Sequence, residues 1–377
     1  MITSEQAEKD LDLKLRSMRL LWHWGYAVRR NVDIGRYVEG RRETPYTDID
    51  VLGTKIHPDL TVSRVLIDCT TETGVGTPEK LFWLSGLIRF TGADYAIFLR
   101  RQMLEAKYID LAGVMGALPL SEPQLGYLEK SYRVPVDRFF GAFSRSASGV
   151  EEAFTILRKF DREMYEYILY QHWWDPPHQR VLTLASICRR IAQNKAAFGK
   201  WVDFLCSYGL SVLSLGALEF ARPILAISED RRPEEIVADL LGGRLQAYER
   251  RKLIASFYDF MTAEIRERYK QKYPVSRKQF VESLAPDYSK YFVDFVLRIC
   301  DDPGAASFMT RVLDLFAYEV ALGQGKFAIS DILSELSSRS GSEILKPAKD
   351  AFDFAFRSGL VTQELFEEFN TSVKALA

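Results

Sequence analysis

The stretch Tyr46–Lys80 decides the fold of this chain. It reads YTDIDVLG, a loop, VLIDCTTE, a Gly-rich turn and TPEK. Two short apolar strands are predicted here, Asp48–Gly53 and Arg64–Thr70, and each carries an acid at its centre. Acidic residues are depleted in strands and are costly to bury unless they are paired or bind a metal. We therefore expect Asp50 and Asp68 to belong to a functional site.

The alternation of a strand places these acids together. Side chains at i and i+2 share a face, so Asp48 and Asp50 project together, and Asp68 and Thr70 do the same on the next strand. If the two strands pair, three carboxylates converge at one edge of the sheet. Such oxygen donors suit Mg²⁺ or Mn²⁺ rather than zinc. Asp48 is either a partner of this site or a cap of its strand, and we favour the cap.

Composition describes an ordinary globular protein. The 377 residues suffice for about two domains. Hydrophobic residues make up 47% and the net charge is −1, so no global field marks a nucleic-acid or membrane binder, although a local basic surface stays open. The four cysteines form no CxxC pair, which indicates buried thiols rather than zinc ligands or disulfides. They are Cys69, Cys188, Cys206 and Cys300.

The sequence predicts a cytoplasmic protein without a membrane partner. Ser4–Arg19 is rich in charge and lacks the apolar core of a signal peptide. We see no run of about 18 apolar residues that would suggest a transmembrane helix.

The first third of the chain predicts an α/β domain over residues 1–120. A helix is expected over 4–25, a strand over 26–34 and a hairpin or loop over 35–45. After the two acidic strands, Thr77 is predicted to cap a helix that begins at Pro78. The remaining expectations are a strand over 94–99, a short helix over 103–107 and a short strand over 108–111. Together they predict a mixed sheet flanked by helices.

From residue 121 the pattern changes. Alternation gives way to long stretches of helical periodicity, separated by short breaks such as Asp175-Pro176-Pro177 and Asp302-Pro303-Gly304. Residues 121–377 are therefore predicted to form a larger all-helical accessory or interaction domain.

The order of these elements, with TDIDVLG and VLIDCTTE on consecutive strands, resembles the restriction-endonuclease-like, or PD-(D/E)XK, nuclease superfamily. Its motif is an Asp on one strand and (Asp/Glu)-x-Lys on the next. Asp50 matches the first acid and Asp68 the second, but Thr70 stands where the motif has Lys. Threonine carries no positive charge, so either the site is inactive or a lysine reaches it from elsewhere. Lys80 is the best candidate, because its helix begins near the exit of the Asp68 strand, whereas Lys55 has an odd offset from Asp50.

The resemblance also implies further site residues. An acid on the first helix often completes the metal site in this superfamily, which makes Glu8 and Asp12 candidates for a Mg²⁺ or Mn²⁺ ligand. Either one alone fits a solvated helix face as well. Several arginines near the acids either contact phosphates or lie on a solvated loop. They are Arg29, Arg30, Arg36, Arg41 and Arg42.

Three functions follow from these patterns. The first is a metal-dependent endonuclease, with DNA favoured over RNA, that serves bacterial defence or DNA processing. Its helical domain would recognise substrate, regulate the site or bind a protein partner, and nucleases of this type often pair as homodimers. The second is an inactive nuclease-like module that binds nucleic acid or a protein. The third is a structural scaffold in which the helical domain does the work.

Overall fold

The N-terminal part of the protein is built on a mixed five-stranded sheet. In a computed structural model the described residues are 4–35, 37–38, 41–42, 46–70, 76–134, 147–270, 275–277, 285–322 and 341–374. The strand order is β1-β4-β5-β6-β7, with antiparallel pairing from β1 to β5 and parallel pairing from β5 to β7. The strands are β1 (Ala27–Ile34), β4 (Thr47–Ile56), β5 (Val62–Thr70), β6 (Tyr95–Arg100) and β7 (Ala117–Ser121). A hairpin of β2 (Tyr37–Val38) and β3 (Arg41–Arg42) joins β1 to β4.

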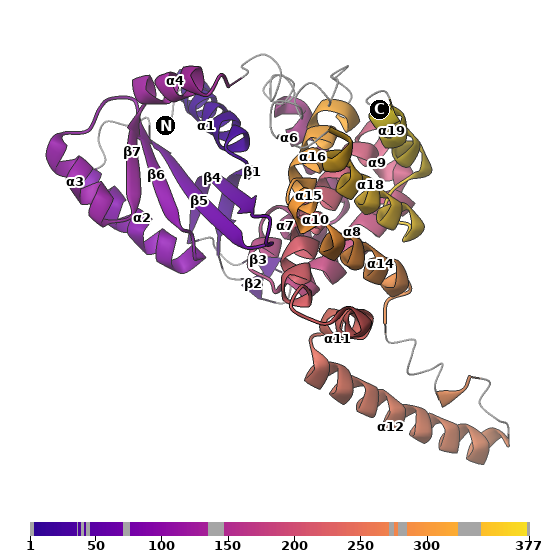
Figure 1. Ribbon diagram of the computed structural model, residues 1–377. Helices are drawn as coiled ribbons and strands as arrows, with labels where there is room; N and C mark the ends of the chain where they lie inside the picture. Colours follow the sequence, from indigo (N-terminus) through magenta and orange to yellow (C-terminus); the bar gives the residue numbers. More distant parts are fainter. Residues whose placement is uncertain are drawn as a thin grey trace.

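Helices cover both faces of this sheet (Figure 1). α1 (Ser4–His23) packs on β1, β4 and β5 and contacts α4 (Glu122–Ser131), which also contacts β7. α2 (Thr77–Thr91) packs on β6 and β7, and α3 (Ala106–Val114) packs on β7 and α2. α1 approaches the strands closely at Gly53, where an added methyl group would lie 3.0 Å from Leu21 Cδ1. The predicted mixed sheet flanked by helices is therefore confirmed.

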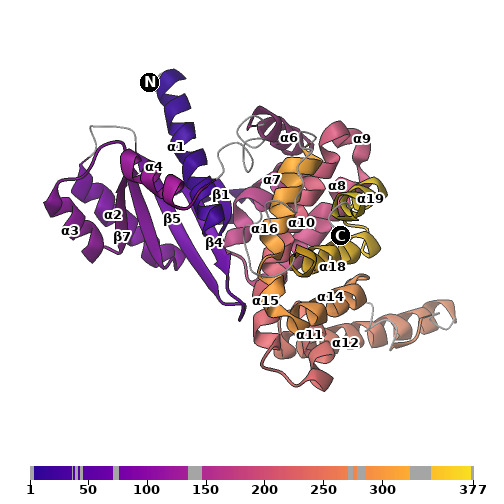
Figure 2. The same ribbon diagram turned by 45° about the horizontal axis from the view of Figure 1, so that its top comes forward.

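The rest of the chain is mostly helical, as predicted (Figure 2). At its centre lies α10 (Val202–Ile224), which contacts α8, α14, α16 and the π-helical turn η4 (Ala317–Ala321). The other α-helices are α6 (Ala147–Phe160), α7 (Arg162–Leu169), α8 (Pro177–Gln193), α9 (Lys195–Phe198), α11 (Arg232–Leu240), α12 (Arg244–Tyr269), α14 (Ser289–Asp301), α15 (Pro303–Ala306), α16 (Met309–Phe316), α18 (Gly341–Arg357) and α19 (Gln363–Lys374). Three 3₁₀ turns complete the described helical part: η1 (Gln171–Trp173), η2 (Gly199–Trp201) and η3 (Glu229–Arg231).

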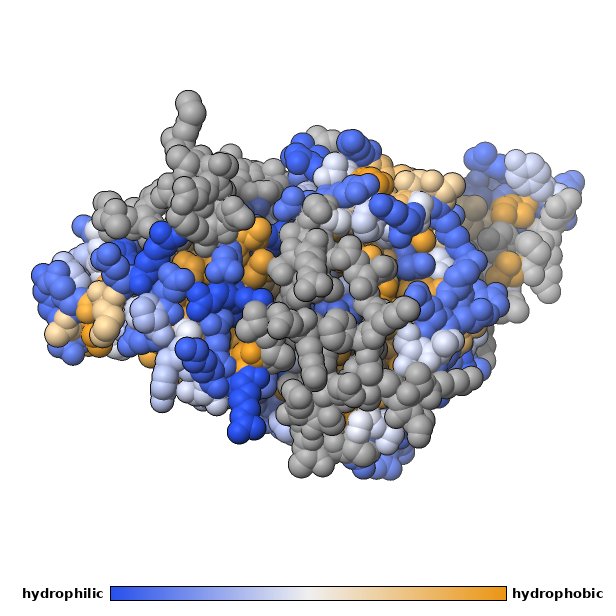
Figure 3. Space-filling model, turned by 90° about the horizontal axis from the view of Figure 1, so that it is seen from above, coloured by the Kyte–Doolittle hydropathy of each residue, from blue (hydrophilic) through white to orange (hydrophobic). Residues whose placement is uncertain are grey.

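Two features of the surface stand out. α12 projects from the helical body and exposes large apolar side chains such as Leu253, Phe257 and Phe260 (Figure 1). Seen from above, the described surface is mainly hydrophilic, with small and separate apolar patches (Figure 3).

Two sequence predictions are corrected by the structure. Residues 108–111 are not a strand but lie within α3, because Ala112 is buried and the helix continues to Val114, with Met115 as its cap before Gly116 at a positive φ of 74°. The strand follows as β7. The cap of α2 is Gly76 rather than Thr77, which is already helical. By length and composition alone, one segment, Lys195–Ile224, could cross a membrane, and 94% of its most apolar window is buried inside the protein.

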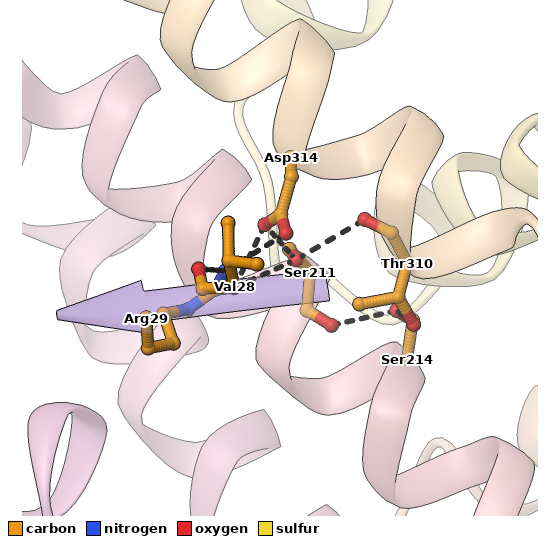
Figure 4. A network of polar contacts seen from close by, with 6 residues as sticks. All are labelled: Val28, Arg29, Ser211, Ser214, Thr310 and Asp314. Carbon is orange, nitrogen blue, oxygen red and sulfur yellow. Dashed lines mark hydrogen bonds and ion pairs between the residues drawn. The ribbon is translucent and has the colours of Figure 1, made fainter. Parts of the chain in front are cut away.

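A buried ion pair joins the sheet to the helical part (Figure 4). Arg29 of the edge strand β1 donates two hydrogen bonds to Asp314 of α16, at 2.7 and 2.8 Å. Ser211 of α10 donates to the same carboxylate and accepts from Arg29 Nη2 at 3.1 Å. Both charged side chains are almost fully buried, at 6% and 2% exposure. This polar network therefore anchors the edge strand β1 to the helical part.

Neighbouring contacts reinforce this junction. Arg311, one turn before Asp314, donates to the Trp22 carbonyl at 2.8 Å and lies 4.6 Å from the centre of the Trp22 ring. Burial lowers the pKa of Arg311 to about 10, although the Asp314 charge opposes the shift. On β5, Arg64 lies 3.6 Å from Glu219 of α10.

The junction predicts a large stability effect. Asp314→Asn keeps the size of the side chain but leaves the Arg29 cation buried without a counter-charge, so we expect a loss of about 3–5 kcal/mol in the free energy of unfolding. Urea denaturation followed by circular dichroism measures it. The double variant Arg29→Met/Asp314→Leu should lose less, because no charge stays buried.

The control is the exposed pair Lys195–Glu364, whose removal by Lys195→Met should leave the urea midpoint close to that of the wild type. Equal losses for Asp314→Asn and Lys195→Met would refute the role of the buried pair.

Candidate functional site

The two predicted acids lie where β4 and β5 separate. The pairing of these strands runs from Ile56 opposite Val62 to Val51 opposite Ile67, and Asp50 and Asp68 are the next positions beyond it. The Asp50 carboxylate accepts a hydrogen bond from the Cys69 backbone N–H at 2.7 Å. This side chain therefore satisfies a backbone donor at the point where the regular β4–β5 pairing ends. Asp68 is 5% exposed and still pairs with Phe98 of β6.

Lys80 reaches Asp68 from the first turn of α2, as the sequence predicted. Its Nζ lies 3.1 Å from Asp68 Oδ1 and 4.7 Å from the centre of the Trp83 ring. The Lys80 side chain is 27% exposed, so it borders solvent while its partner is buried. The structure thus brings together a carboxylate on β5 and a lysine that lies twelve residues later in the sequence.

A second lysine, which the sequence analysis missed, reaches Asp50. Lys14 Nζ of α1 lies 2.7 Å from Asp50 Oδ1 and 3.0 Å from Asn31 Oδ1. A signal was present, because Lys14 follows Leu11 by three residues and precedes Met18 by four, which places it along the apolar stripe of α1. A lysine on the buried side of an amphipathic helix needs an anionic partner there.

The backbone is unusual beside this pair. Asn31 of β1 lies across from Asp50, between the paired positions Arg30–Val51 and Val32–Ile49. Its φ is 51°, in the left-handed region that Asn tolerates better than most residues. This conformation accompanies the side-chain contact of Asn31 with Lys14.

Burial has the largest effect on the pKa of Asp50, and the Lys14 ammonium is the main opposing influence. Burial raises the pKa of Asp50, the Lys14 ammonium and the Cys69 N–H oppose this shift, and the Asp68 charge adds to it. Burial also raises the pKa of the Cys69 thiol well above its usual range, so this cysteine stays protonated. The four cysteines are free and buried, as predicted. At the end of β6, the Asp68 charge favours the cationic form of Arg100, whose pKa burial lowers.

Other predicted site residues lie outside this cluster. Asp48 is exposed opposite Asp33. Asp12 is also exposed, and its charge acts on Arg16 rather than on Asp50. Lys55 donates to the Trp24 carbonyl at 3.1 Å, away from the acids, as its offset predicted. The side chains of Glu8 and Thr70 lie outside the described part of the protein. Within that part, no three acids, histidines or cysteines form a metal-binding group.

Of the five arginines considered for phosphate contact, Arg29 and Arg30 lie beside acids in the described part of the protein. Arg29 is not a phosphate ligand, because its guanidinium is buried against Asp314. Arg30 lies 3.2 Å from Glu151 of α6 and has a side chain that is 15% exposed. Arg36 lies outside the described residues, as do the side chains of Arg41 and Arg42 on β3.

The pairing of Lys14 with Asp50 can be tested by titration. Because Lys14 opposes the effect of burial, Lys14→Met should raise the pKa of Asp50 further, as measured by carbon NMR of the carboxyl group. When the pKa of an Asp is higher in the folded than in the unfolded state, the free energy of unfolding falls as the pH rises from the unfolded-state pKa to the folded-state pKa. Lys14→Met should make this fall in the free energy of unfolding larger. Lys55→Met is the matched control and should leave Asp50 unchanged. An unaltered Asp50 titration in Lys14→Met would contradict the assignment.

No family model, curated protein or solved structure matches this chain. Its chemistry is therefore inferred from the residues of the site itself, above all from the two carboxylates and the two lysines that pair with them.

Proposed function

We propose that the protein is a metal-dependent nuclease that hydrolyses phosphodiester bonds of nucleic acid, with DNA favoured over RNA. The observation that carries this proposal is the 3.1 Å contact between Lys80 and Asp68, because it supplies the lysine that the motif lacks at Thr70. The order α1, β1, β4, β5, α2, β6, with acids on the second and third of these strands, supports a restriction-endonuclease-like fold for the N-terminal part. The proposed compartment is the cytoplasm.

The donor set fits Mg²⁺ or Mn²⁺. Mg²⁺ is usually bound by one or two carboxylates, keeps several waters and contacts substrate phosphates. Asp50 and Asp68 would hold the cation from adjacent strands. Each is neutralised by a lysine, so cation binding requires one ammonium to move aside, and the partly exposed Lys80 has the freer side chain. When bound, the cation would polarise the phosphate and acidify a water.

The protein's own residues would then position the reaction. The Lys80 ammonium would lie beside the phosphate and stabilise negative charge as it develops on the non-bridging oxygens. Lys14, held between Asp50 and Asn31, would fix the orientation of the Asp50 carboxylate. The hydrogen bond from Cys69 N–H holds the other oxygen of the same carboxylate.

The alternative is an inactive nuclease-like module that binds nucleic acid or a protein. Two closed ion pairs neutralise both acids, and this arrangement is stable without a cation. Threonine in the motif position and the burial of Arg29 also favour this alternative. For a protein partner or a second copy of the chain, the exposed apolar side chains of α12 offer contact area.

Cleavage assays test the proposal. Wild-type protein with Mg²⁺ or Mn²⁺ should cleave plasmid, single-stranded DNA or RNA, and Lys80→Met should reduce turnover about 100- to 1,000-fold by removing transition-state charge stabilisation. Asp68→Asn should also lose cleavage. Lys55→Met serves as the matched lysine control and should keep wild-type activity.

Metal binding separates the two functions. Calorimetry with Mn²⁺ should show binding to the wild type and to Lys80→Met, and a loss of binding in Asp50→Asn. In the opposite outcome, the wild type binds no Mn²⁺ and cleaves no substrate, yet still binds nucleic acid in the presence of a chelator. That result would identify the protein as an inactive nuclease-like module.

A further inference from the structure

A cavity lies where the sheet meets the helical part. It has a volume of about 340 Å³, is partly open to solvent and is lined by residues of α1, β1, α6, α7, α10 and the π-helical turn η4. Ligand sites are commonly concave, of about 300–1,000 Å³, and favour boundaries between domains. This cavity is therefore of a size for one small molecule.

Aromatic rings and guanidinium groups line it. Tyr208 and Tyr318 are buried, whereas Tyr165 and Tyr170 are partly exposed, and their hydroxyl oxygens lie 3.3 Å apart. Arg158 is exposed, and its guanidinium carbon lies 5.7 Å from the centre of the Tyr165 ring. Aromatic side chains stack on nucleobases, and Arg binds phosphates with two parallel hydrogen bonds.

The charge balance favours an anion. Arg29 is neutralised by Asp314, and Arg30 lies beside Glu151, so these pairs contribute no net charge. Across the described part of the chain, Arg158 has no carboxylate partner. One positive charge next to tyrosine rings fits a ligand that has both an aromatic ring and a phosphate.

We infer that this cavity binds a nucleotide, with the base among the tyrosines and the phosphate at Arg158. The nucleotide is either a free mononucleotide or one unit of a bound nucleic acid, since both present the same groups. This inference does not depend on nuclease activity.

The cavity also contacts the candidate active site. Asn31 lines it, and the side-chain oxygen of Asn31 accepts from the same Lys14 ammonium that pairs with Asp50. A nucleotide that engages Asn31 would therefore alter the surroundings of Lys14. Two sites that share a side chain in this way influence each other's binding reciprocally.

Equilibrium dialysis of the full chain tests the site, with chelator present so that cleavage plays no part. The probes are AMP, ATP and a short 5′-phosphorylated DNA. Arg158→Ala should weaken binding about tenfold or more, because it removes a charged partner of the phosphate. Tyr165→Leu should also weaken it. Lys159→Ala, the exposed neighbour on the same helix, is the matched control and should bind like the wild type.

Each outcome decides the inference. Mononucleotide binding that depends on Arg158 and Tyr165 identifies a free nucleotide ligand, whereas binding of the DNA alone, with the same dependence, identifies a unit of nucleic acid. Absence of binding by all probes at millimolar concentration, or binding that Arg158→Ala leaves intact, overturns it. Circular dichroism of each variant confirms that it is folded.

The coupling between the cavity and the Lys14–Asp50 pair can be measured separately from nucleotide binding. Binding of the nucleotide should shift the Asp50 carboxyl signal in NMR spectra of the wild type, and Asn31→Gly, which tolerates the left-handed backbone, should remove that shift. An Asp50 signal that does not respond in the wild type would overturn the coupling.

Discussion

The arrangement of this protein depends on the ion pair between Arg29 and Asp314. Two charges are buried there at the edge of the sheet, and their desolvation is offset by good geometry and by the Ser211 hydroxyl. A pair of this kind tolerates little displacement, so it fixes where the helical part lies against β1. Two residues beyond Arg29, the same strand presents Asn31 to Lys14. The junction therefore also holds one wall of the candidate site.

The candidate site itself balances burial against charge. Two carboxylates lie where β4 and β5 separate; burial penalises the charged form of Asp50, and the Asp68 charge adds to this effect. Lys14 and Lys80 compensate from helices on the two sides of the sheet. The result is a nearly neutral cluster, and the proposed cation would have to displace a lysine in order to bind there. The proposed nuclease and the alternative binding module thus differ in whether a cation replaces a lysine beside these carboxylates.

Local patterns explain how much could be predicted from the sequence. Asp50, Asp68 and Lys80 follow from strand alternation and from a helix start nearby in the chain, which depend on few residues. Lys14 could not be paired with Asp50 from sequence, because the pairing depends on how α1 lies on the sheet. For Arg29 the sequence predicts either a phosphate contact or a solvated loop, and it could not predict the ion pair with Asp314 because that partner is 285 residues away. The strand predicted at 108–111 failed because the helical packing of Ala112 outweighs the β propensity of Tyr and Ile.

Because Asn31 lines the cavity, its contact with Lys14 connects the cavity to the candidate site. Lys14 divides its hydrogen bonds between a carboxylate of the site and an amide of the cavity wall. A ligand that binds the Asn31 amide would change the hydrogen bonding of Lys14 and therefore its pairing with Asp50. A cation that binds the Asp50 carboxylate would likewise change the contact between Lys14 and Asn31. Because one ammonium serves both places, occupation of either changes the free energy of binding at the other, without any movement of the sheet. The candidate site and the cavity are thereby linked through a single side chain of α1.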